Sequence, residues 1–488
     1  MAPSDGAIEG LKATLVADIV RVVVQGALVI VLVRLFLTPG EYGLLFLAIS
    51  VFSVALLFGQ LGFPKSAARY VAEYRETDPG QVPHIVRVSM GYNAVTVGIT
   101  AIVVAAASGP IARAIGEPAL APFLLLGFGY IVFSALNGYL HLVFQGFNRV
   151  DLSAIVVVVT NLGTLGFVLG LVAVGFGALG ALFGYIAGYA VASVVGLVML
   201  HRTLSAYERA PAIGYDLPRR IAEYSVPLTV TRSANVLYKR VDLVLIGFFL
   251  TPVAVGYYTL AKQIADFVMA PAQALGFTVS PTYGERKAGE QLESAARLYE
   301  STFEGICLLY LPGIVGLVLV AEPMVRHVFG TAYLGAVPAI QVLSGFVLFQ
   351  AIDKITNDGL DYLGRARARA IAKGATGVLN FVLSLLLIPV VGIVGAAAAT
   401  VFSFGLMVAF NVYVIHTELG LDLARMARSL AHVSLIALAM GAVVWLSVPL
   451  ATNILALFAV VGLGLLVWLV AASFFGMVDP REPMTLIS

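Results

Sequence analysis

The stretch Phe36-Leu37-Thr38-Pro39 occurs twice in this chain, because Phe249-Leu250-Thr251-Pro252 repeats it letter for letter. The agreement continues at the same spacing into the residues that follow each copy. Gly43 corresponds to Gly256, and Leu47-Ala48 corresponds to Leu260-Ala261. A match of this length at a constant spacing indicates that one unit is present in two copies.

Weaker matches extend the repeat along most of the chain. Gln60-Leu61-Gly62-Phe63 returns with one inserted residue as Gln273-Ala274-Leu275-Gly276-Phe277, Phe133 and Arg149 fall on Phe349 and Arg365, Phe167-Val168-Leu169 falls on Phe381-Val382-Leu383, and Gly177-Ala178-Leu179-Gly180-Ala181 falls on Gly392-Ile393-Val394-Gly395-Ala396. The register drifts by only two or three residues over roughly 150 positions, which supports a true duplication. Duplicated units are typical of transporters whose halves move around a central site.

The composition places this duplicated unit in a membrane. Hydrophobic residues make up 60% of the chain and charged residues 11%, against roughly 45–50% and about 25% in soluble domains. The single cysteine, Cys307, excludes an intramolecular disulfide and a cluster of thiolate ligands. We therefore expect no metal and no cofactor. The N-terminal segment carries Asp5 and Glu9 but no basic leader, which favours a retained first helix over a cleaved signal peptide.

Apolar stretches predict fourteen membrane-spanning helices. Each stretch has about twenty residues or more, enough to cross a hydrocarbon core of about 30 Å. The expected spans are residues 12–37, 42–63, 84–108, 119–145, 151–174, 178–200, 222–250, 253–280, 297–321, 335–360, 367–390, 393–416, 427–448 and 452–475. The expected fold is an all-α polytopic membrane protein with no soluble domain between the spans.

The repeat divides these spans into two lobes and an appendix. Spans 1–6 form an N-terminal lobe (residues 1–200), and a cytoplasmic linker (201–221) leads to a C-terminal lobe of spans 7–12 (222–416). Residues 417–488 hold spans 13 and 14, which have no repeat partner, and a cytoplasmic tail. Because six crossings return the chain to its starting side, the two lobes are expected to have the same orientation in the membrane.

Basic residues set the expected topology. The segments after even-numbered spans hold Lys65, Arg69, Arg75, Arg87, Arg149, Arg202, Arg209, Arg219, Arg220, Arg286, Lys287, Arg297, Arg365, Arg367, Arg369, Lys373, Arg425 and Arg428. The segments after odd-numbered spans hold Arg113 and Arg326 and little else. Because positive loops stay on the cytoplasmic side, we expect both termini in the cytoplasm. The expected location is the plasma membrane of a bacterium or archaeon.

Polar and charged side chains also lie inside the spans, where they are costly and mark transport pathways. Their spacing puts them on single helical faces. Span 1 carries Asp18, Arg21 and Gln25, span 7 carries Arg232, Asn235, Lys239 and Asp242, span 8 carries Lys262, Asp266 and Gln273, and span 10 carries Asp353. Arg240 is a further cation within span 7, next to Lys239. These faces predict a water-filled cavity lined by spans 1, 7 and 8. The excess of cationic groups favours an anionic guest such as a phosphate.

Two simpler interpretations stay open. Asp18 with Arg21, Lys239 with Asp242, and Lys262 with Asp266 could each be a self-contained ion pair between helices. Asn137 and His141 in span 4 are more typical of satisfied packing groups than of titrating ones.

The span 7 region resembles a known family. Lys239-Arg240-Val241-Asp242, Gly247, Thr251-Pro252, Val255-Gly256-Tyr257-Tyr258 and Ala261 look like a signature of polysaccharide and lipid-linked oligosaccharide flippases (Wzx-like), within the multidrug/oligosaccharidyl-lipid/polysaccharide exporter superfamily. Glu41-Tyr42 with Gly43, Leu363-Gly364-Arg365 and Gly392-Ile393-Val394-Gly395-Ala396-Ala397-Ala398 are similar to other recurring pieces of that family. The resemblance covers essentially the whole chain.

This resemblance implies a function. A polyprenyl- or dolichyl-phosphate-linked oligosaccharide would move from the inner to the outer leaflet by alternating access between two lobes. Substrate would contact Arg21, Arg232, Lys239, Arg240 and Lys262, with Gln25, Asn235 and Gln273 as polar neighbours, and spans 13 and 14 would hold the lipid tail. Asp242, Asp266 and Asp353 are the candidate carboxylates for ion coupling. The expected partners are the substrate, membrane lipids and glycosyltransferases or a polymerase of the same pathway, without nucleic acid, and the expected state is a monomer.

Other classes fit the sequence less well. A cation-coupled multidrug antiporter needs a net acidic cavity, whereas this one is net basic. An integral-membrane glycosyltransferase or polymerase needs catalytic loops, but the outer turns are short and His327 is their only histidine. A non-transporting scaffold leaves the polar stripes unexplained. No Walker-type glycine loop is present, so the chain gives no support for ATP hydrolysis.

Overall fold

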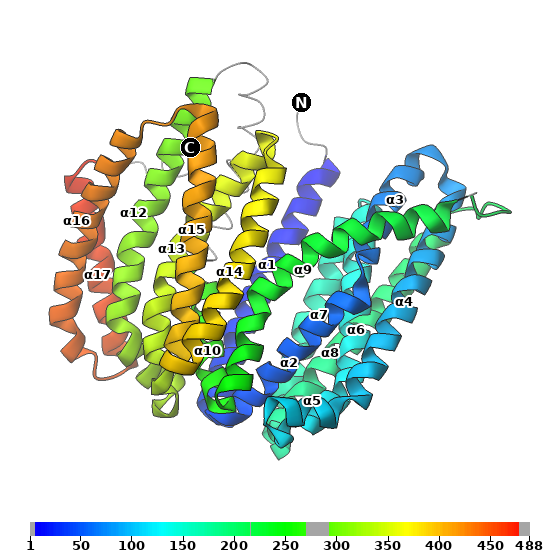
Figure 1. Cartoon of the computed structure of the whole chain (residues 1–488), viewed down its shortest axis with the longest axis horizontal. Helices are drawn as coiled ribbons and strands as arrows, with labels where there is room; N and C mark the ends of the chain where they lie inside the picture. Colours follow the sequence, from blue (N-terminus) through cyan, green and yellow to red (C-terminus); the bar gives the residue numbers. More distant parts are fainter. Residues whose placement is uncertain (1–4, 215, 270–291, 478–488) are drawn as a thin grey trace. The chain divides into compact units, whose positions relative to one another are not determined.

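The computed structural model describes residues 5–214, 216–269 and 292–477, and within these ranges it leaves aside the side chains of residues 5–9, 11, 230–239, 292, 358, 361, 362 and 366. The described residues form helices joined by short turns, without a β-strand (Figure 1). The chain divides into two compact units, Met1–Gly256 and Tyr257–Ser488. We describe each unit separately.

The first unit contains the helices up to the second copy of the repeated motif. They are α1 (Asp5–Val31), which continues as a π-helical turn (Leu32–Phe36), α2 (Pro39–Gln60), α3 (Phe63–Thr77), α4 (Val82–Ala106), α5 (Ser108–Ile115), α6 (Ala121–Gly146), α7 (Val150–Leu171), α8 (Gly177–Leu204) and α9 (Leu217–Phe249). Helices α7 and α8 pack along each other, and α6 packs on α8, α4 and α3.

The second unit holds most of α10 (Pro252–Val268), which begins at the end of the first unit. Its other long helices are α12 (Leu292–Met324), α13 (Val337–Tyr362), α14 (Ala366–Val391), α15 (Ile393–Leu419), α16 (Leu423–Ser447) and α17 (Ile454–Phe474). Helix α15 packs on α13 and α14, and α16 packs on both α12 and α17.

The helices confirm the predicted all-α polytopic fold. Eleven stretches of the described residues are long and apolar enough to cross a membrane. One of them, Val150–Leu204, contains both α7 and α8, which the chain separates by a bend at Gly175 (φ 99°). The predicted spans 222–250 and 253–280 coincide with α9 and, up to Val268, with α10. The hydropathy of the sequence therefore locates the long helices correctly, because backbone groups in lipid must be satisfied within a helix.

The first copy of the repeated motif starts α2. Thr38 is the N-cap, Pro39 occupies the first turn, and the Thr38 side chain accepts a hydrogen bond from the Glu41 backbone N–H at 3.3 Å. The Glu41 carboxylate accepts in return from the Thr38 N–H at 2.9 Å. This capping box satisfies two backbone donors that the helix itself leaves free. The motif is therefore a helix start signal placed directly after α1.

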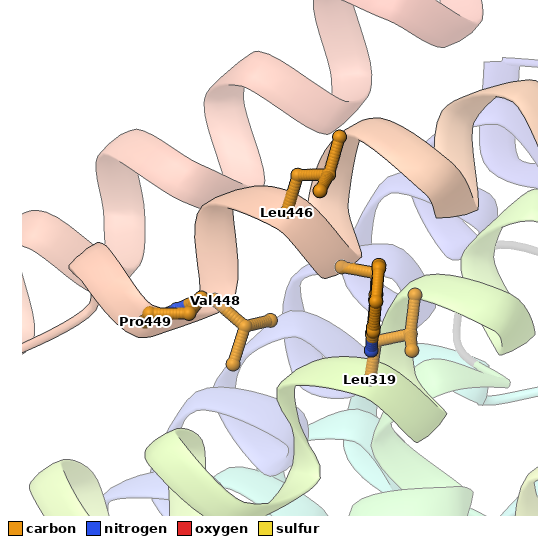
Figure 2. A pocket seen from close by; sticks show the side chains of 5 residues that line it. Leu319, Leu446, Val448 and Pro449 are labelled. Atoms are coloured by element: carbon orange, nitrogen blue, oxygen red, sulfur yellow. The ribbon is translucent and has the colours of Figure 1, made fainter.

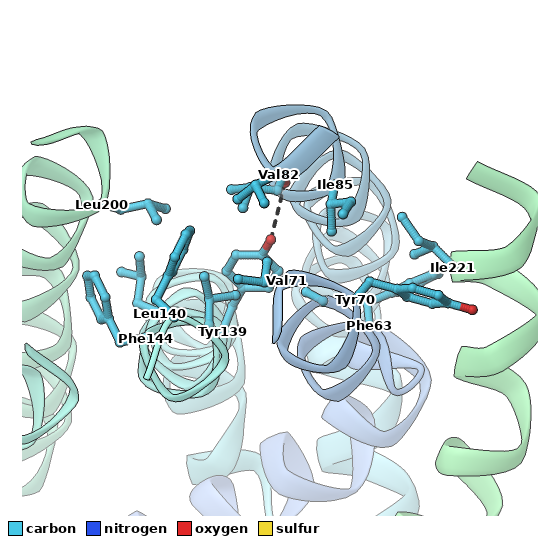
Figure 3. Packing of buried hydrophobic residues seen from close by; sticks show 14 of the residues in the cluster. Phe63, Tyr70, Val71, Val82, Ile85, Tyr139, Leu140, Phe144, Leu200 and Ile221 are labelled. Atoms are coloured by element: carbon cyan, nitrogen blue, oxygen red, sulfur yellow. Dashed lines mark hydrogen bonds between the residues drawn. The ribbon is translucent and has the colours of Figure 1, made fainter. Parts of the chain in front are cut away.

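Helix α3 was not among the predicted elements. It is amphipathic: Ala67, Tyr70 and Val71 are buried, whereas Lys65 and Arg69 lie on its other side. Its buried face belongs to a core shared with α4, α6, α8 and α9 (Figure 3). A search for long apolar spans misses such a helix, because only one of its faces is apolar.

Helix α9 and the segment before it are tied to the first unit. The Gln81 side chain donates to the Ala212 carbonyl at 3.1 Å and accepts from the Gly214 N–H at 2.9 Å. Ser66 donates to the Ile221 carbonyl at 3.0 Å at the start of α9. Along the chain, the boundary between the compact units thus falls after Gly256, whereas the predicted linker is 201–221. Compactness does not test how transport lobes move, so the lobe boundaries stay a prediction.

Candidate functional site

Arg240 on α9 lies among three tyrosines of the first unit. Its guanidinium interacts electrostatically with the phenol groups of Tyr130 on α6 and of Tyr185 and Tyr189 on α8. Arg240 is half-buried and forms no ion pair with any carboxylate that the structure describes. A half-buried cation near phenols and without a described counter-ion is suited to an anionic ligand.

The tyrosine rings are fixed by aromatic packing. The centroids of Tyr130 and Tyr189 are 5.5 Å apart and their planes meet at 87°. The Tyr130 ring also packs against Phe52 of α2 at 5.2 Å. Edge-to-face pairs at such distances are favourable because the edge of one ring is positive and the face of the other is negative. Three helices therefore contribute to one aromatic cluster beside Arg240.

The predicted charges of α1 form an ion pair. The Arg21 guanidinium lies 2.9 Å from the Asp18 carboxylate one turn earlier, and both side chains are close to half exposed. The ion pair that the simpler interpretation expects is therefore present, while a role of Arg21 in substrate binding stays a prediction. Arg21 consequently adds less net positive charge than the sequence suggests. Gln25, one turn further along α1, is exposed.

His141 on α6 lies near this ion pair and interacts electrostatically with Arg21 and Asp18. The Ser153 hydroxyl is 2.7 Å from His141 Nδ1 and 3.1 Å from the His141 carbonyl oxygen. The Gln145 amide nitrogen is 3.1 Å from His141 Nε2. If Ser153 donates to the carbonyl, Nδ1–H donates to Ser153 and Nε2 accepts from Gln145, so a neutral ring is fully satisfied.

Asn137, one turn before His141, donates to the Thr160 hydroxyl at 2.9 Å. The expectation that Asn137 and His141 are packing groups is therefore confirmed, since both have partners on α7 or on their own helix.

The carboxylates proposed for ion coupling have different surroundings. Asp353 on α13 accepts hydrogen bonds from Asn357 at 2.5 Å and from Asn411 of α15 at 3.4 Å. Asp266 on α10 is exposed, and Asp242 on α9 is fully buried. Asp353 thus lies beside two amides, and the side-chain oxygens of both amides lack a hydrogen-bond partner among the described residues.

Lys262 on α10 lies over the ring of Tyr258, with its Nζ 5.8 Å from the ring centroid. The side chains of Arg232, Asn235 and Lys239, and the whole of Gln273, lie outside the described residues. The predicted cationic stripe is therefore described only at Arg240, Arg21 and Lys262. In the described part of the chain, no group of three or more His, Cys, Asp or Glu side chains could hold a metal.

The three tyrosines near Arg240 are candidate site residues that the sequence analysis did not name. Tyr185 and Tyr189 stand four residues apart, so the sequence could have predicted that they share a face of α8. Their relation to Tyr130 and Arg240 is not readable, because it depends on how three separate helices pack.

A shallow apolar groove opens on the second unit between α12 and α16 (Figure 2). Leu319 lines one side, and Leu446, Val448 and Pro449 line the other, with Trp445 beside them. Trp445 and Leu446 keep most of their surface exposed, at 64% and 70%. The groove has the chemistry of a surface for hydrocarbon.

The long apolar helices define a polytopic membrane protein. The sequence match is more specific. The family model described as "Polysaccharide biosynthesis protein" matches residues 11–281, more than half of the chain. The chain belongs to this family, and the resemblance inferred from its motifs is confirmed.

Curated relatives match part of the chain. The probable low-salt glycan biosynthesis flippase Agl15 of Haloferax volcanii is 27% identical over 234 residues, 48% of each chain. The probable flippase AglR of the same organism is 27% identical over 268 residues, 54% of each chain. The teichuronic acid biosynthesis protein TuaB of Bacillus subtilis is 27% identical over 150 residues, 30% of each chain. The chain thus spans about half the length of the first two relatives, and less of the third.

Solved structures share the fold over more of the chain. The lipid II flippase MurJ in an inward closed conformation has a TM-score of 0.75 and 16% identity, covering 96% of this chain and 98% of its own. An inward-facing multidrug resistance MATE family transporter of the MOP superfamily has a TM-score of 0.63 and 15% identity, covering 80% and 94%. At these identities the likeness concerns the fold alone.

Proposed function

We propose that this protein is a flippase for a lipid-linked oligosaccharide. It would carry a polyprenyl- or dolichyl-phosphate-linked glycan from the inner to the outer leaflet of the plasma membrane, with both termini in the cytoplasm. Glycosyltransferases or a polymerase of the same pathway would supply and use the glycan. Membership of the polysaccharide biosynthesis family and the flippase names of the Haloferax relatives support this assignment.

Arg240 is the observation that carries the proposal. A half-buried guanidinium near the phenols of α6 and α8, without a described carboxylate partner, is costly unless water or an anion reaches it. A phosphate matches its planar donors well, since two parallel N–H groups can bind two oxygens. A multidrug antiporter for cations would place negative charge here instead.

The apolar groove of the second unit supports the lipid part of the proposal. It presents Leu319, Leu446, Val448 and Pro449 without a charged side chain among its lining residues. A polyprenyl tail that stays in the bilayer could lie along this surface while the headgroup crosses. Ion coupling through Asp242, Asp266 or Asp353 stays a prediction.

Reconstituted vesicles test the function. The purified protein would be placed in liposomes with a fluorescent short-chain polyprenyl diphosphate carrying N-acetylglucosamine, and a membrane-impermeant quencher would report which leaflet holds the probe. We expect faster exchange than in protein-free vesicles. Arg240→Gln should slow it at least tenfold, because a lost charge-assisted hydrogen bond costs about 1.5–3 kcal/mol.

Arg113→Gln is the matched control, because Arg113 is an exposed arginine on the short helix α5 and its only described bond is to the Gly109 carbonyl at 3.4 Å. This variant should keep the wild-type rate. Exchange by the wild-type protein no faster than in empty vesicles would contradict the proposed function. Equal rates for wild type and Arg240→Gln would remove Arg240 from the substrate path.

A further inference from the structure

We propose that Tyr130, Tyr185, Tyr189 and Arg240 form a subsite for an anionic saccharide, in which the tyrosines receive a sugar ring and Arg240 receives the negative charge next to it. This inference rests on the proposed function and makes it more specific. It assigns the recognition of the sugar to the first unit, whereas sequence reasoning considered only charged and amide side chains.

The tyrosines differ in how far they are open to a ligand. Tyr130 is only 7% exposed, and its ring is held between Phe52 and Tyr189. Tyr185 and Tyr189 are half-buried and keep accessible surface. Tyr130 is therefore a fixed support, and the two tyrosines of α8 are the groups that a ligand can touch.

Glycines fix the direction in which α8 presents these two tyrosines. A side chain at Gly184 would meet Val168 of α7 at 2.5 Å, and one at Gly188 would meet Thr164 at 2.4 Å. The glycine face of α8 is thus pressed onto α7, which explains why the two helices run so closely together. Tyr185 and Tyr189 each follow one of these glycines, about 100° further round the helix, so they are turned away from α7.

The chemistry of the cluster favours a sugar over a purely apolar guest. Phenol rings offer a flat face to the C–H groups of a pyranose, and their hydroxyls can donate to or accept from sugar hydroxyls. Binding sites for small polar ligands commonly combine aromatic walls with a few placed polar groups. The Tyr130 and Tyr189 side chains hydrogen-bond to each other. A hydrocarbon tail would leave the Arg240 guanidinium without a partner, which is unfavourable.

The charge that Arg240 binds could belong to the phosphate of the lipid or to a uronic acid in the glycan. Both are oxyanions that a guanidinium binds through charge-assisted hydrogen bonds. Three soluble short-chain probes separate these sources: farnesyl diphosphate without sugar, the same diphosphate bearing N-acetylglucosamine, and the same diphosphate bearing glucuronic acid. Binding to the full-length detergent-solubilised protein would be measured by scintillation proximity with radiolabelled probes.

Tyr185→Leu should weaken the binding of both sugar-bearing probes about threefold to tenfold and leave the sugar-free probe within about twofold, since aromatic contacts contribute about 0.5–1.5 kcal/mol. Tyr185→Phe keeps the ring and should keep most of the affinity. Tyr413→Leu is the matched control, because Tyr413 is 63% exposed on α15. It should bind all probes normally.

Arg240→Gln should weaken all three probes if the bound charge is phosphate, and chiefly the glucuronic acid probe if it is a carboxylate. Either result supports the subsite. Equal weakening of sugar-bearing and sugar-free probes by Tyr185→Leu, or no weakening of any, would overturn it. If the wild-type protein binds none of the probes, the proposed function itself fails, which is a different outcome.

Discussion

Gly43 and Gly256, which hold the same position in the two copies of the repeated motif, each lie against the helix start of the other copy. A side chain at Gly43 would stand 1.7 Å from the Pro252 carbonyl oxygen, and one at Gly256 would stand 2.1 Å from the Pro39 carbonyl oxygen. Both contacts lie within the first compact unit. The two copies therefore meet symmetrically, backbone against backbone, where only glycine fits.

Gly43→Ala should destabilise the protein, because a methyl group cannot occupy a site 1.7 Å from a backbone oxygen and the helices must move apart. We expect a loss of roughly 1–3 kcal/mol, seen as a lower midpoint of thermal unfolding in detergent. Gly91→Ala on α4 is the control, since nothing lies within 4 Å of its added methyl. The same midpoint for both variants would disprove the close crossing.

The predicted topology places this crossing of the two motif copies on the outer side of the membrane. Transport by alternating access would require the crossing to open. A Cβ at Gly40 would stand 3.6 Å from a side-chain methyl of Val253, close enough for a disulfide between cysteines at these positions. In a Cys307→Ala background, oxidised Gly40→Cys/Val253→Cys should lose exchange activity and regain it with a reductant. Full activity of the oxidised pair, with the disulfide confirmed by mass spectrometry, would argue against an opening at this point.

The two copies of the motif should differ in how strongly they cap their helices. Thr38 forms a full capping box with Glu41, whereas Thr251 accepts a single bond from the Ala254 N–H at 3.4 Å. Thr38→Ala should therefore cost about 1 kcal/mol of stability and Thr251→Ala clearly less. Thermal unfolding of the two variants side by side measures the difference. A larger effect at Thr251 would contradict the described caps.

Tyr139 holds the core of the first unit through its hydroxyl. This group is 2.7 Å from the Ser89 hydroxyl and donates to the Val86 carbonyl at 3.1 Å, in a fully buried position (Figure 3). Tyr139→Phe should lower stability by about 0.5–1.5 kcal/mol, because the bonds are lost and no water replaces them. Tyr413→Phe removes an exposed hydroxyl and serves as the comparison. Equal unfolding midpoints would be inconsistent with this buried network.

The topology predicts which side of the membrane each turn faces. In a Cys307→Ala background, Arg367→Cys should react with a membrane-impermeant thiol reagent only after the cells are opened, because basic segments stay inside. Val174, which is 76% exposed, lies in the turn between α7 and α8, and Val174→Cys should react in intact cells. The reverse pattern would invert the predicted orientation.

Hydropathy and the repeat were sufficient to predict where the long helices lie in the sequence. An apolar stretch in lipid has no alternative to a helix, so the ends of α2, α6 and α15 fall within a few residues of the predicted spans 42–63, 119–145 and 393–416. Helix α3 was not predicted from hydropathy, because the burial of its apolar face depends on other helices. The ion pair between Arg21 and Asp18 could be predicted from the sequence as one of two interpretations, since both side chains lie one turn apart on the same helix.

The sequence by itself determined the class of protein, the positions of its membrane helices and the duplication. These properties are local: they follow from the free energy of placing each segment in lipid and from residues that recur at one spacing. Only the tertiary structure decided that Gly43 meets the second copy of the motif, and that Tyr130, Tyr185 and Tyr189 gather beside Arg240. Those relationships join helices far apart in the chain, and the rotation and contact of packed helices depend on every side chain between them.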